Sequence, residues 1–170
     1  SGSVPRELQQ KMIINVLTDT SISQATFYYR FYLNRALNYT GNADRYYKEL
    51  KPWRDMIGLG LTTFAEEPDP TRSDCHAWSS SPNYDFFATI CGINPSKPGF
   101  ASVKITPALG ELNHVVGEMP HPNGIIKVEI QKDGANGVIA NIELPSNTPG
   151  LFSWKGKQAS LHPGKQHIKF

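Results

Sequence analysis

The sequence predicts an α+β protein in which about four helices precede an antiparallel β-sandwich. Up to about residue 93, apolar residues recur at three- and four-residue spacing, which is typical of helices. After Pro95 they alternate with polar residues, and clusters of turn-forming residues separate the alternating runs, as in a sandwich of short strands. The 170 residues are the length of about one ordinary domain, and a hydrophobic content of 39% is sufficient for a packed core.

Four segments of the first half are predicted to be helical. One begins near Pro5, which suits a first helical turn, and carries a single apolar stripe. The next, over 23–37, is apolar around nearly its whole circumference, so it needs protein on several sides. A third spans 43–57 and is restarted or kinked by Pro52. The last covers residues 81–92, where a serine cap and a proline open the helix.

These helices leave too much apolar surface uncovered for a closed bundle, so we expect them to be cut from a larger helical assembly. Separated from that assembly, the chain should expose an apolar face and self-associate. The residues expected on this face are Phe27, Tyr28, Phe31 and Tyr32.

Short alternating runs make up the second half of the chain. Two of them flank the turn-rich connection 132–137 and are predicted to pair as a hairpin with their apolar residues on one face. The apolar positions are Ile126, Val128 and Ile130 in the first run and Val138, Ala140, Ile142 and Leu144 in the second. Further candidate strands lie at 103–105, 151–154 and 166–170.

The charge balance and the cysteines exclude several classes of function. With 17 Lys and Arg against 15 Asp and Glu, the chain has no field strong enough to favour a nucleic acid or an anionic membrane as partner. No apolar run approaches the roughly 18 residues of a membrane span. Cys75 and Cys91 form no C-x-x-C pair, and two reduced thiols are favoured over one disulfide.

The connection over 58–82 holds the side chains best suited to chemistry. Carboxylates can do the acid and base work of glycoside hydrolysis, a histidine can hydrogen-bond sugar hydroxyls, and an indole can stack on a pyranose. Composition alone favours this interpretation no more than a polar surface loop with a structural histidine and an anchoring tryptophan. Zinc is disfavoured, because the Asp, Cys and His of the loop are contiguous. The candidates are Glu66, Glu67, Asp69, Asp74, His76 and Trp78.

Several motifs follow one another between about residues 20 and 130. The most specific is Leu61-Thr62-Thr63-Phe64-Ala65-Glu66 followed by Asp74-Cys75-His76-Ala77-Trp78-Ser79. The others are Gln24–Phe31, Pro52–Met56, Gly92-Ile93, Pro98-Gly99-Phe100, Ile105-Thr106-Pro107 and Pro122-Asn123-Gly124. In this order they resemble the C-terminal part of bacterial α-L-rhamnosidases of glycoside hydrolase family 78.

The resemblance implies that residues 1–95 are the last helices of an (α/α)6 toroid, the catalytic domain, and that 96–170 form a C-terminal β-sandwich domain. It implies a bacterial, inverting hydrolase that releases terminal α-linked L-rhamnose from glycosides or polysaccharides without a metal or an organic cofactor. The general acid would lie in the missing N-terminal part of the catalytic domain, so this fragment alone is expected to hydrolyse nothing. A periplasmic and a cytoplasmic location are both compatible with the sequence.

Two residues acquire roles from this resemblance, and a third is a candidate from the residue types of the loop. The family's general base is the glutamate after the Thr-Thr pair, which is Glu66 here. The histidine that contacts rhamnose falls on His76, and Trp78 is the aromatic candidate for the sugar. The chain departs from the family at Ala65, where many members carry a bulky aromatic residue.

Three alternatives stay open beside this interpretation. Glu67 is the runner-up for the base, and is otherwise expected to be solvated or to pair with Arg72. The sandwich could be a non-catalytic carbohydrate-binding module, although Trp154 is its one tryptophan after residue 100 and it has no tyrosine there. A toroidal glycosidase for another sugar would fit the helical half equally well.

Overall fold

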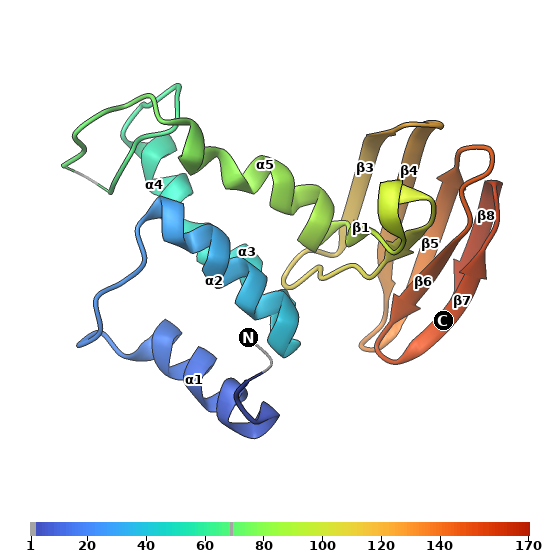
Figure 1. The fold of residues 1–170 in the computed structure, drawn as a ribbon, viewed down its shortest axis with the longest axis horizontal. Helices are drawn as coiled ribbons and strands as arrows, with labels where there is room; N and C mark the ends of the chain where they lie inside the picture. Colours follow the sequence, from blue (N-terminus) through green and yellow to red (C-terminus); the bar gives the residue numbers. More distant parts are fainter. Residues whose placement is uncertain (1–2, 69) are drawn as a thin grey trace. The chain divides into compact units, whose positions relative to one another are not determined.

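The computed structural model describes residues 3–68 and 70–170, and the chain divides into two compact units between Asn83 and Tyr84. The first, called the helical unit here, contains only helices and loops (Figure 1). The second, called the sandwich unit, contains two β-sheets. The α+β class predicted from the sequence is therefore confirmed.

The helices begin and end where the sequence supplies caps. α2 ends at Gly41, which adopts the left-handed conformation (φ 75°) and donates its N–H to the Asn38 carbonyl. A proline stands in the first turn of α4, so Pro52 restarts the helix as expected. The predicted start of the second helix at residue 23 is wrong, because Thr26 is still extended. The elements are α1 (Arg6–Thr18), α2 (Phe27–Thr40), η1 (Ala43–Arg45), α3 (Tyr46–Glu49), α4 (Lys51–Gly58), η2 (Ala77–Ser80) and α5 (Ser81–Asp85).

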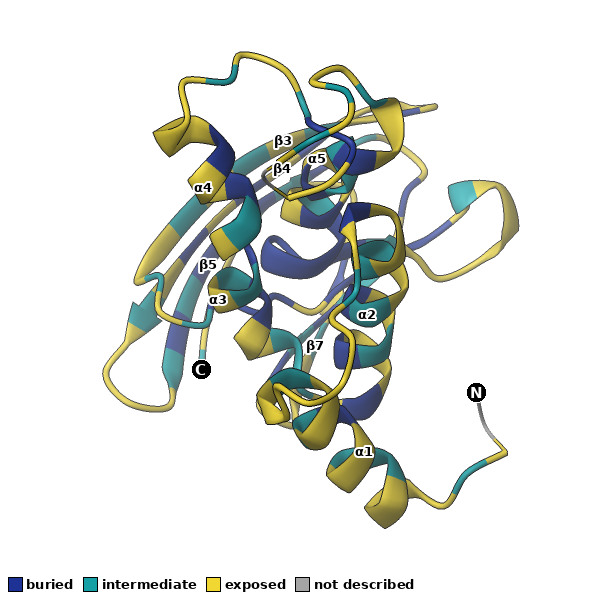
Figure 2. Cartoon of the chain, turned by 90° about the vertical axis from the view of Figure 1, so that its left-hand side faces the viewer, coloured by how far each residue is buried: buried dark blue, intermediate teal, exposed yellow. Residues whose placement is uncertain are grey.

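The helical unit has a small core. Phe27 is 1% exposed and packs on Trp53 with ring centroids 5.1 Å apart, so its expected place on the exposed face is wrong. The Trp53 indole N–H donates to the Ser79 carbonyl at 2.7 Å, which ties α4 to η2. Along α2 buried residues recur at positions 27, 34, 37 and 40, with exposed or half-buried residues between them (Figure 2). The apolar stripe of α1 has Ile13 buried and Leu8, Met12 and Val16 exposed.

The sandwich unit consists of two four-stranded sheets, with strand orders β1-β2-β6-β7 and β3-β4-β5-β8 (Figure 1). All strand pairs are antiparallel except β2 with β6, which is parallel, so the expectation of a wholly antiparallel sandwich is corrected at that pair. β1, β3 and β7 were not anticipated by the alternation. The strands are β1 (Ile93–Pro95), β2 (Val103–Ile105), β3 (His114–His121), β4 (Gly124–Asp133), β5 (Gly137–Leu144), β6 (Gly150–Trp154), β7 (Lys157–Leu161) and β8 (Gly164–Lys169).

The predicted hairpin forms the centre of the second sheet. Val128 lies opposite Ile142 and Ile130 opposite Ala140, and all four are at most 2% exposed. Their side chains meet those of the other sheet in one core, as inward-facing residues of two packed sheets do. The indole of Trp154 donates to the Asn136 carbonyl at 2.8 Å and fixes the turn of the hairpin.

A π-helical turn, η3 (Phe86–Ile90), follows α5 and packs against β1 and β3. Its exit requires a glycine: Gly92 has φ 72°, and a Cβ there would lie 2.1 Å from the carbonyl carbon of Thr106. Cys91 is buried against Gly117, where an added Cβ would approach the sulfur to 2.8 Å. Both cysteines of the chain are free thiols, as the sequence favoured.

The expected domain division, with toroid helices over 1–95 and a sandwich domain over 96–170, concerns the parent enzyme and stays a prediction. Within this chain, β1 already belongs to a sheet of the sandwich, and the compact units separate before it, between Asn83 and Tyr84. In the described part of the chain no helix has the length and apolarity needed to cross a membrane.

Candidate functional site

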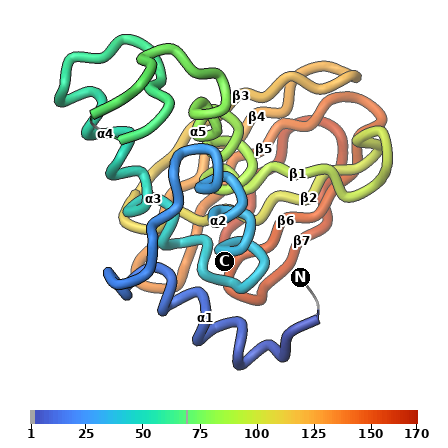
Figure 3. Tube along the Cα trace, turned by 60° about the vertical axis from the view of Figure 1, so that its left-hand side comes forward, coloured from blue at the N-terminus to red at the C-terminus, as the bar shows by residue number. Residues whose placement is uncertain are grey.

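The loop from α4 to η2 folds back on itself (Figure 3), and backbone hydrogen bonds across it bring Glu66 and His76 together. The Glu66 N–H donates to the Ser73 carbonyl at 2.8 Å, and the His76 N–H donates to the Phe64 carbonyl at 2.7 Å. The Thr63 hydroxyl also donates to a carbonyl of the opposite arm. These cross-loop hydrogen bonds place the side chains of Glu66 and His76 side by side, although ten positions separate them in the sequence.

Glu66 is 4% exposed, and both of its carboxylate oxygens are engaged. Arg72 Nε donates to Oε2 at 2.9 Å, and a second guanidinium N–H donates to Oε1. His76 Nε2 lies 3.7 Å from Oε1, which is close enough for electrostatic attraction when the imidazole is protonated. This bidentate contact with the guanidinium of Arg72 fixes the plane of the Glu66 carboxylate.

The electrostatics keep Glu66 ionised. Its hydrogen bond and ion pair with Arg72 lower the pKa of the carboxyl, burial acts in the opposite direction, and His76 lowers the pKa further. Reciprocally, Glu66 raises the pKa of Arg72. A carboxylate held in its charged form can accept a proton from water, whereas a glycosidase general acid needs the opposite shift.

His76 and Trp78 form a stacked pair beside this carboxylate. Their rings lie 4.4 Å apart at 39°, and Trp78 is 45% exposed, so it presents an accessible surface beside the histidine. Trp78 also meets the ring of Tyr28 edge to face, with ring centroids 5.7 Å apart. Among the described residues, His76 Nδ1 is buried and has no hydrogen-bond partner.

The remaining candidates of the loop lie apart from this group. Glu67 is exposed, which agrees with the first of its two expectations, a solvated side chain. The hydrogen-bonded partner of Arg72 is Glu66, and Glu67 acts on the guanidinium only through its charge. Asp74 and Cys75 are exposed too. Asp69 lies outside the described residues.

Sequence reasoning missed two neighbours of the group. Arg72 was expected beside Glu67 and not beside Glu66. The pairing of the two loop arms would have indicated the right partner, because it places Ser73, the neighbour of Arg72, opposite Glu66. Tyr28 lies in a segment that is apolar on every side, and that pattern does not reveal which residues face outward. No group of three His, Cys, Asp or Glu side chains suited to a metal ion occurs in the described ranges, 3–68 and 70–170.

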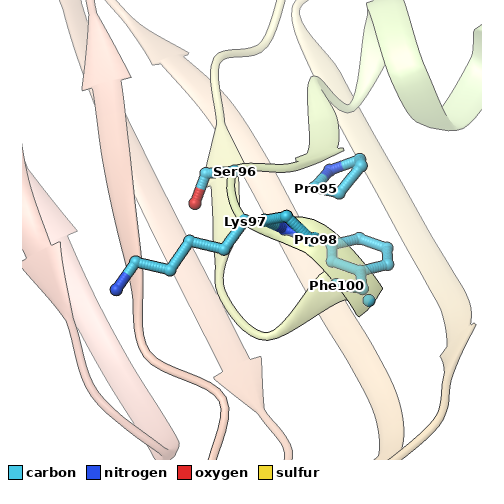
Figure 4. Close-up of a pocket in the computed structure, with 6 residues that line it drawn as sticks. Pro95, Ser96, Lys97, Pro98 and Phe100 are labelled. Carbon is cyan, nitrogen blue, oxygen red and sulfur yellow. The ribbon is translucent and has the colours of Figure 1, made fainter.

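A separate depression of about 440 Å³ lies in the sandwich unit, and the last residue of β1 and the loop that follows it supply the whole lining (Figure 4). The rings of Pro95, Pro98 and Phe100 gather on one side, and Lys97 extends away from them. Phe100 has φ 59°, and its carbonyl accepts a hydrogen bond from His121 Nε2 at 2.9 Å. The histidine thus supports a strained turn, and no catalytic pair of side chains lines the depression.

Comparisons with known proteins agree with the fold. Residues 92–167 match the family of bacterial alpha-L-rhamnosidase C-terminal domains. None of the curated proteins matches the chain in sequence.

Three solved structures of similar fold are alpha-L-rhamnosidases. The native enzyme from Aspergillus terreus has a TM-score of 0.83 at 18% identity, over 96% of this chain and 21% of that one. The Streptomyces avermitilis enzyme, complexed with L-rhamnose, has a TM-score of 0.82 at 18% identity, over 100% of this chain and 20% of that one. The GH78 family rhamnosidase of Bacillus sp. GL1 has a TM-score of 0.77 at 23% identity, over 85% of this chain and 17% of that one.

The chain spans about a fifth of the length of these three enzymes. Residues 92–167 therefore resemble the C-terminal domain of bacterial alpha-L-rhamnosidases, as the sequence motifs indicated.

Proposed function

We propose that this chain, whose residues 92–167 belong to the bacterial alpha-L-rhamnosidase C-terminal domain family, completes an inverting glycosidase that releases terminal α-linked L-rhamnose. In this proposal the helices up to about residue 95 are the last of an (α/α)6 catalytic domain, and 96–170 are its C-terminal β-domain. The observation that carries the proposal is a buried, ionised carboxylate, Glu66, beside the half-exposed pair of His76 and Trp78.

Glu66 has the properties of a general base. Inversion requires one carboxylate to take a proton from the attacking water while a carboxylic acid protonates the leaving oxygen, with about 6.5–9.5 Å between the two groups. Arg72 keeps Glu66 charged and oriented, which supports the base and not the acid. The acid would come from the missing N-terminal part of the catalytic domain, so this chain alone is expected to have no rhamnosidase activity.

His76 and Trp78 would contact the rhamnose. The indole offers an apolar surface for the C–H face of the sugar. The unpaired Nδ1 of His76 would gain a partner from a sugar hydroxyl, because a buried polar atom without a hydrogen bond is costly. Rhamnose is a 6-deoxy sugar, and its methyl group enlarges the apolar surface that an aromatic wall can cover.

The sandwich unit is assigned a structural role in this proposal. Its single tryptophan, Trp154, is 5% exposed and already donates to a backbone carbonyl, so it is not available to a sugar. This disfavours a carbohydrate-binding module built on the sheets. A glycosidase for a different sugar remains the competing function, and a substrate panel separates the two.

The test is Glu66→Gln in the complete enzyme that contains this chain, assayed with aryl glycosides of L-rhamnose and other sugars. Loss of a general base reduces turnover by about 10²–10⁴-fold, and KM should change little, because the amide preserves the shape of the side chain. Glu67→Gln is the matched control and should keep more than about a tenth of the activity. Retention of activity in Glu66→Gln with loss in Glu67→Gln would transfer the role to Glu67.

A further inference from the structure

Glu66, the proposed base, is closed off by residues of its own loop. Its side chain is 3% exposed, whereas the side chain of Arg72, which contacts it, is 76% exposed. Arg72 Nε donates to Oε2 at 2.9 Å, and a second N–H of the guanidinium donates to Oε1. His76 Nε2 lies 3.7 Å from Oε1. Both carboxylate oxygens therefore contact side chains of this loop, and very little of the carboxylate reaches solvent.

This arrangement is unfavourable for proton transfer from water to Glu66. A general base must come within about 2.6–3.2 Å of the water that it deprotonates, and it works best when its pKa lies near the working pH. The hydrogen bond with Arg72 moves the pKa of the Glu66 carboxyl down, away from neutrality. The ion pair thus keeps the carboxylate ionised and oriented, but it reduces both the access of water and the strength of the base.

A further cost arises at the sugar. The transition state of glycoside hydrolysis resembles an oxocarbenium ion, so positive charge develops on the sugar ring. The negative charge of the Glu66 carboxylate stabilises that cation, and a guanidinium bound to the same carboxylate offsets this stabilisation. The contact with Arg72 is therefore suited to a resting enzyme and not to the moment of reaction.

The loop allows the arginine side chain to leave while its backbone stays in place. The Glu66 N–H donates to the Ser73 carbonyl at 2.8 Å, which ties the two arms of the loop together. The Thr71 hydroxyl donates to the Ser73 carbonyl at 2.8 Å and accepts from the Ser73 N–H at 3.2 Å, which fixes the turn around Arg72. Among the described residues the guanidinium hydrogen-bonds to Glu66 alone, so rotation of one exposed side chain opens the contact.

A second carboxylate is at hand for the guanidinium once it has left Glu66. Glu67 is exposed and already acts on Arg72 through its charge. Ion pairs of an exposed cation contribute little net free energy, so the exchange of one glutamate for the other costs little. The closed and open forms are then close in free energy, and both can be populated.

We propose that the contact of Arg72 with Glu66, called the clasp here, holds the base in a closed resting form. In the active form the guanidinium leaves at least one carboxylate oxygen, and the attacking water takes its place. This inference rests on the proposed function, because it concerns the access of water to the base. It makes the clasp inhibitory, so weakening it accelerates the reaction, whereas an arginine that only positions the base would have the opposite effect.

The test is the response of the complete enzyme to salt, with a neutral aryl rhamnoside as substrate. Salt screens the attraction between an exposed guanidinium and a carboxylate, so sodium chloride should open the clasp and raise kcat/KM of the wild type. Arg72→Gln removes the clasp, so its kcat/KM should exceed that of the wild type at low salt and should not rise further with salt. Because exposed ion pairs are weak, both increases should be about two- to fivefold.

Lys51→Gln is the matched control, because Lys51 is another exposed cation of the helical unit and pairs with a carboxylate, Asp55, at 2.6 Å. It should leave kcat/KM and its salt response unchanged. The closed form itself is measured in the 170-residue chain by labelling carboxylates with a carbodiimide and an amine. Mass spectrometry should show slower labelling of Glu66 than of Glu67 in the wild type, and Arg72→Gln should remove most of that difference.

The outcomes separate the clasp from the proposed function. A fall in kcat for Arg72→Gln, with wild-type activity that salt lowers or leaves unchanged, overturns the clasp and leaves the rhamnosidase assignment intact. Equal labelling of Glu66 and Glu67 in the wild type overturns the closed form, and protection of Glu66 that survives Arg72→Gln shows that other residues cover it and overturns the clasp. The expected salt response and labelling, obtained only with a glycoside of another sugar, support the clasp and overturn rhamnose as substrate.

Discussion

The sandwich unit and the helical unit differ in how completely they cover their own apolar residues. In the sandwich, both sheets turn one face inward and the residues between them form a single core, with positions such as Phe152 and Ile130 fully buried. In the helical unit, α1 buries one residue, and α2 exposes a row of tyrosines. The sandwich thus covers the residues between its sheets by itself, whereas the helical unit leaves aromatic side chains exposed around the candidate site.

This difference assigns separate tasks to the two units. Apolar residues that are fully covered by their own unit contribute packing energy and present no surface on which a ligand could pack. The site residues Glu66, His76 and Trp78 all lie in the helical unit, where half-exposed aromatic and charged groups remain available. Mutations in the sandwich should therefore affect stability, and mutations on the helical surface should affect binding or association.

The largest effect on stability is expected from Phe152→Ala. Phe152 is fully buried in the sandwich core, and truncation of a buried phenylalanine costs about 3–5 kcal/mol of unfolding free energy. Urea denaturation followed by the fluorescence of Trp154, on the same strand, measures the change.

Two exposed residues serve as controls for that comparison. Val116→Ala in the sandwich and Met12→Ala on α1 remove side chains that are 65% and 50% exposed, so each should change the unfolding free energy by less than about 0.5 kcal/mol. A cost of about 2 kcal/mol or more for Met12→Ala would show that α1 is covered in solution, by self-association of the kind expected from the sequence.

The two cysteines test the same contrast by their reactivity. Burial raises the pKa of Cys91 in the sandwich unit to about 11, whereas Cys75 is exposed on the loop of the helical unit. At pH 8 a thiol of pKa 11 is about one part in a thousand thiolate, so iodoacetamide should modify Cys75 at least about 100-fold faster than Cys91. Mass spectrometry of the alkylated peptides gives both rates, and 6 M urea should bring them close together. Similar rates in the native chain would contradict the burial of Cys91.

The sequence predicted those strands whose signal is local. β4 and β5 alternate clearly and are joined by a short turn, so their pairing follows from pattern and turn chemistry alone. β3 alternates between exposed and less exposed positions, but a glycine and a histidine stand at two of its inward positions and a proline at an outward one, so the apolar alternation is weak in the sequence. The parallel pairing of β2 with β6 joins segments more than forty residues apart, and no local pattern encodes such a contact.

The same distinction holds for the candidate site. The grouping of Glu66 with His76 was anticipated, since both belong to one loop and to one family motif. The preference of Arg72 for Glu66 over Glu67 depends on which side chain the loop turns inward, and only the cross-loop hydrogen bonds decide it. The outward row of tyrosines on α2 was not resolvable either, because a helix apolar on every side has no periodic signal for its exposed face.

The smallest expected effect concerns the ion pair that orients Glu66. Arg72 lowers the pKa of the Glu66 carboxyl below its ordinary value, so Arg72→Gln should raise that pKa towards the ordinary value. NMR titration of the side-chain carboxyl carbon measures the shift directly. Arg6→Gln, which removes the same charge from an exposed position of the helical unit, should leave the Glu66 titration unchanged.

The ion pair also predicts how stability depends on pH. Because the pKa of Glu66 is lower in the folded chain than in the unfolded chain, the pair stabilises the fold above the unfolded pKa, and this contribution is lost as the pH falls through the folded pKa. Urea midpoints of the wild type and Arg72→Gln should therefore differ at pH 7 and converge in acid. The guanidinium is largely exposed, so the difference at pH 7 should be small and should shrink with added salt. A gap between the two proteins that persists below the folded pKa would mean that Arg72 acts through packing of its side chain and not through the charge of Glu66.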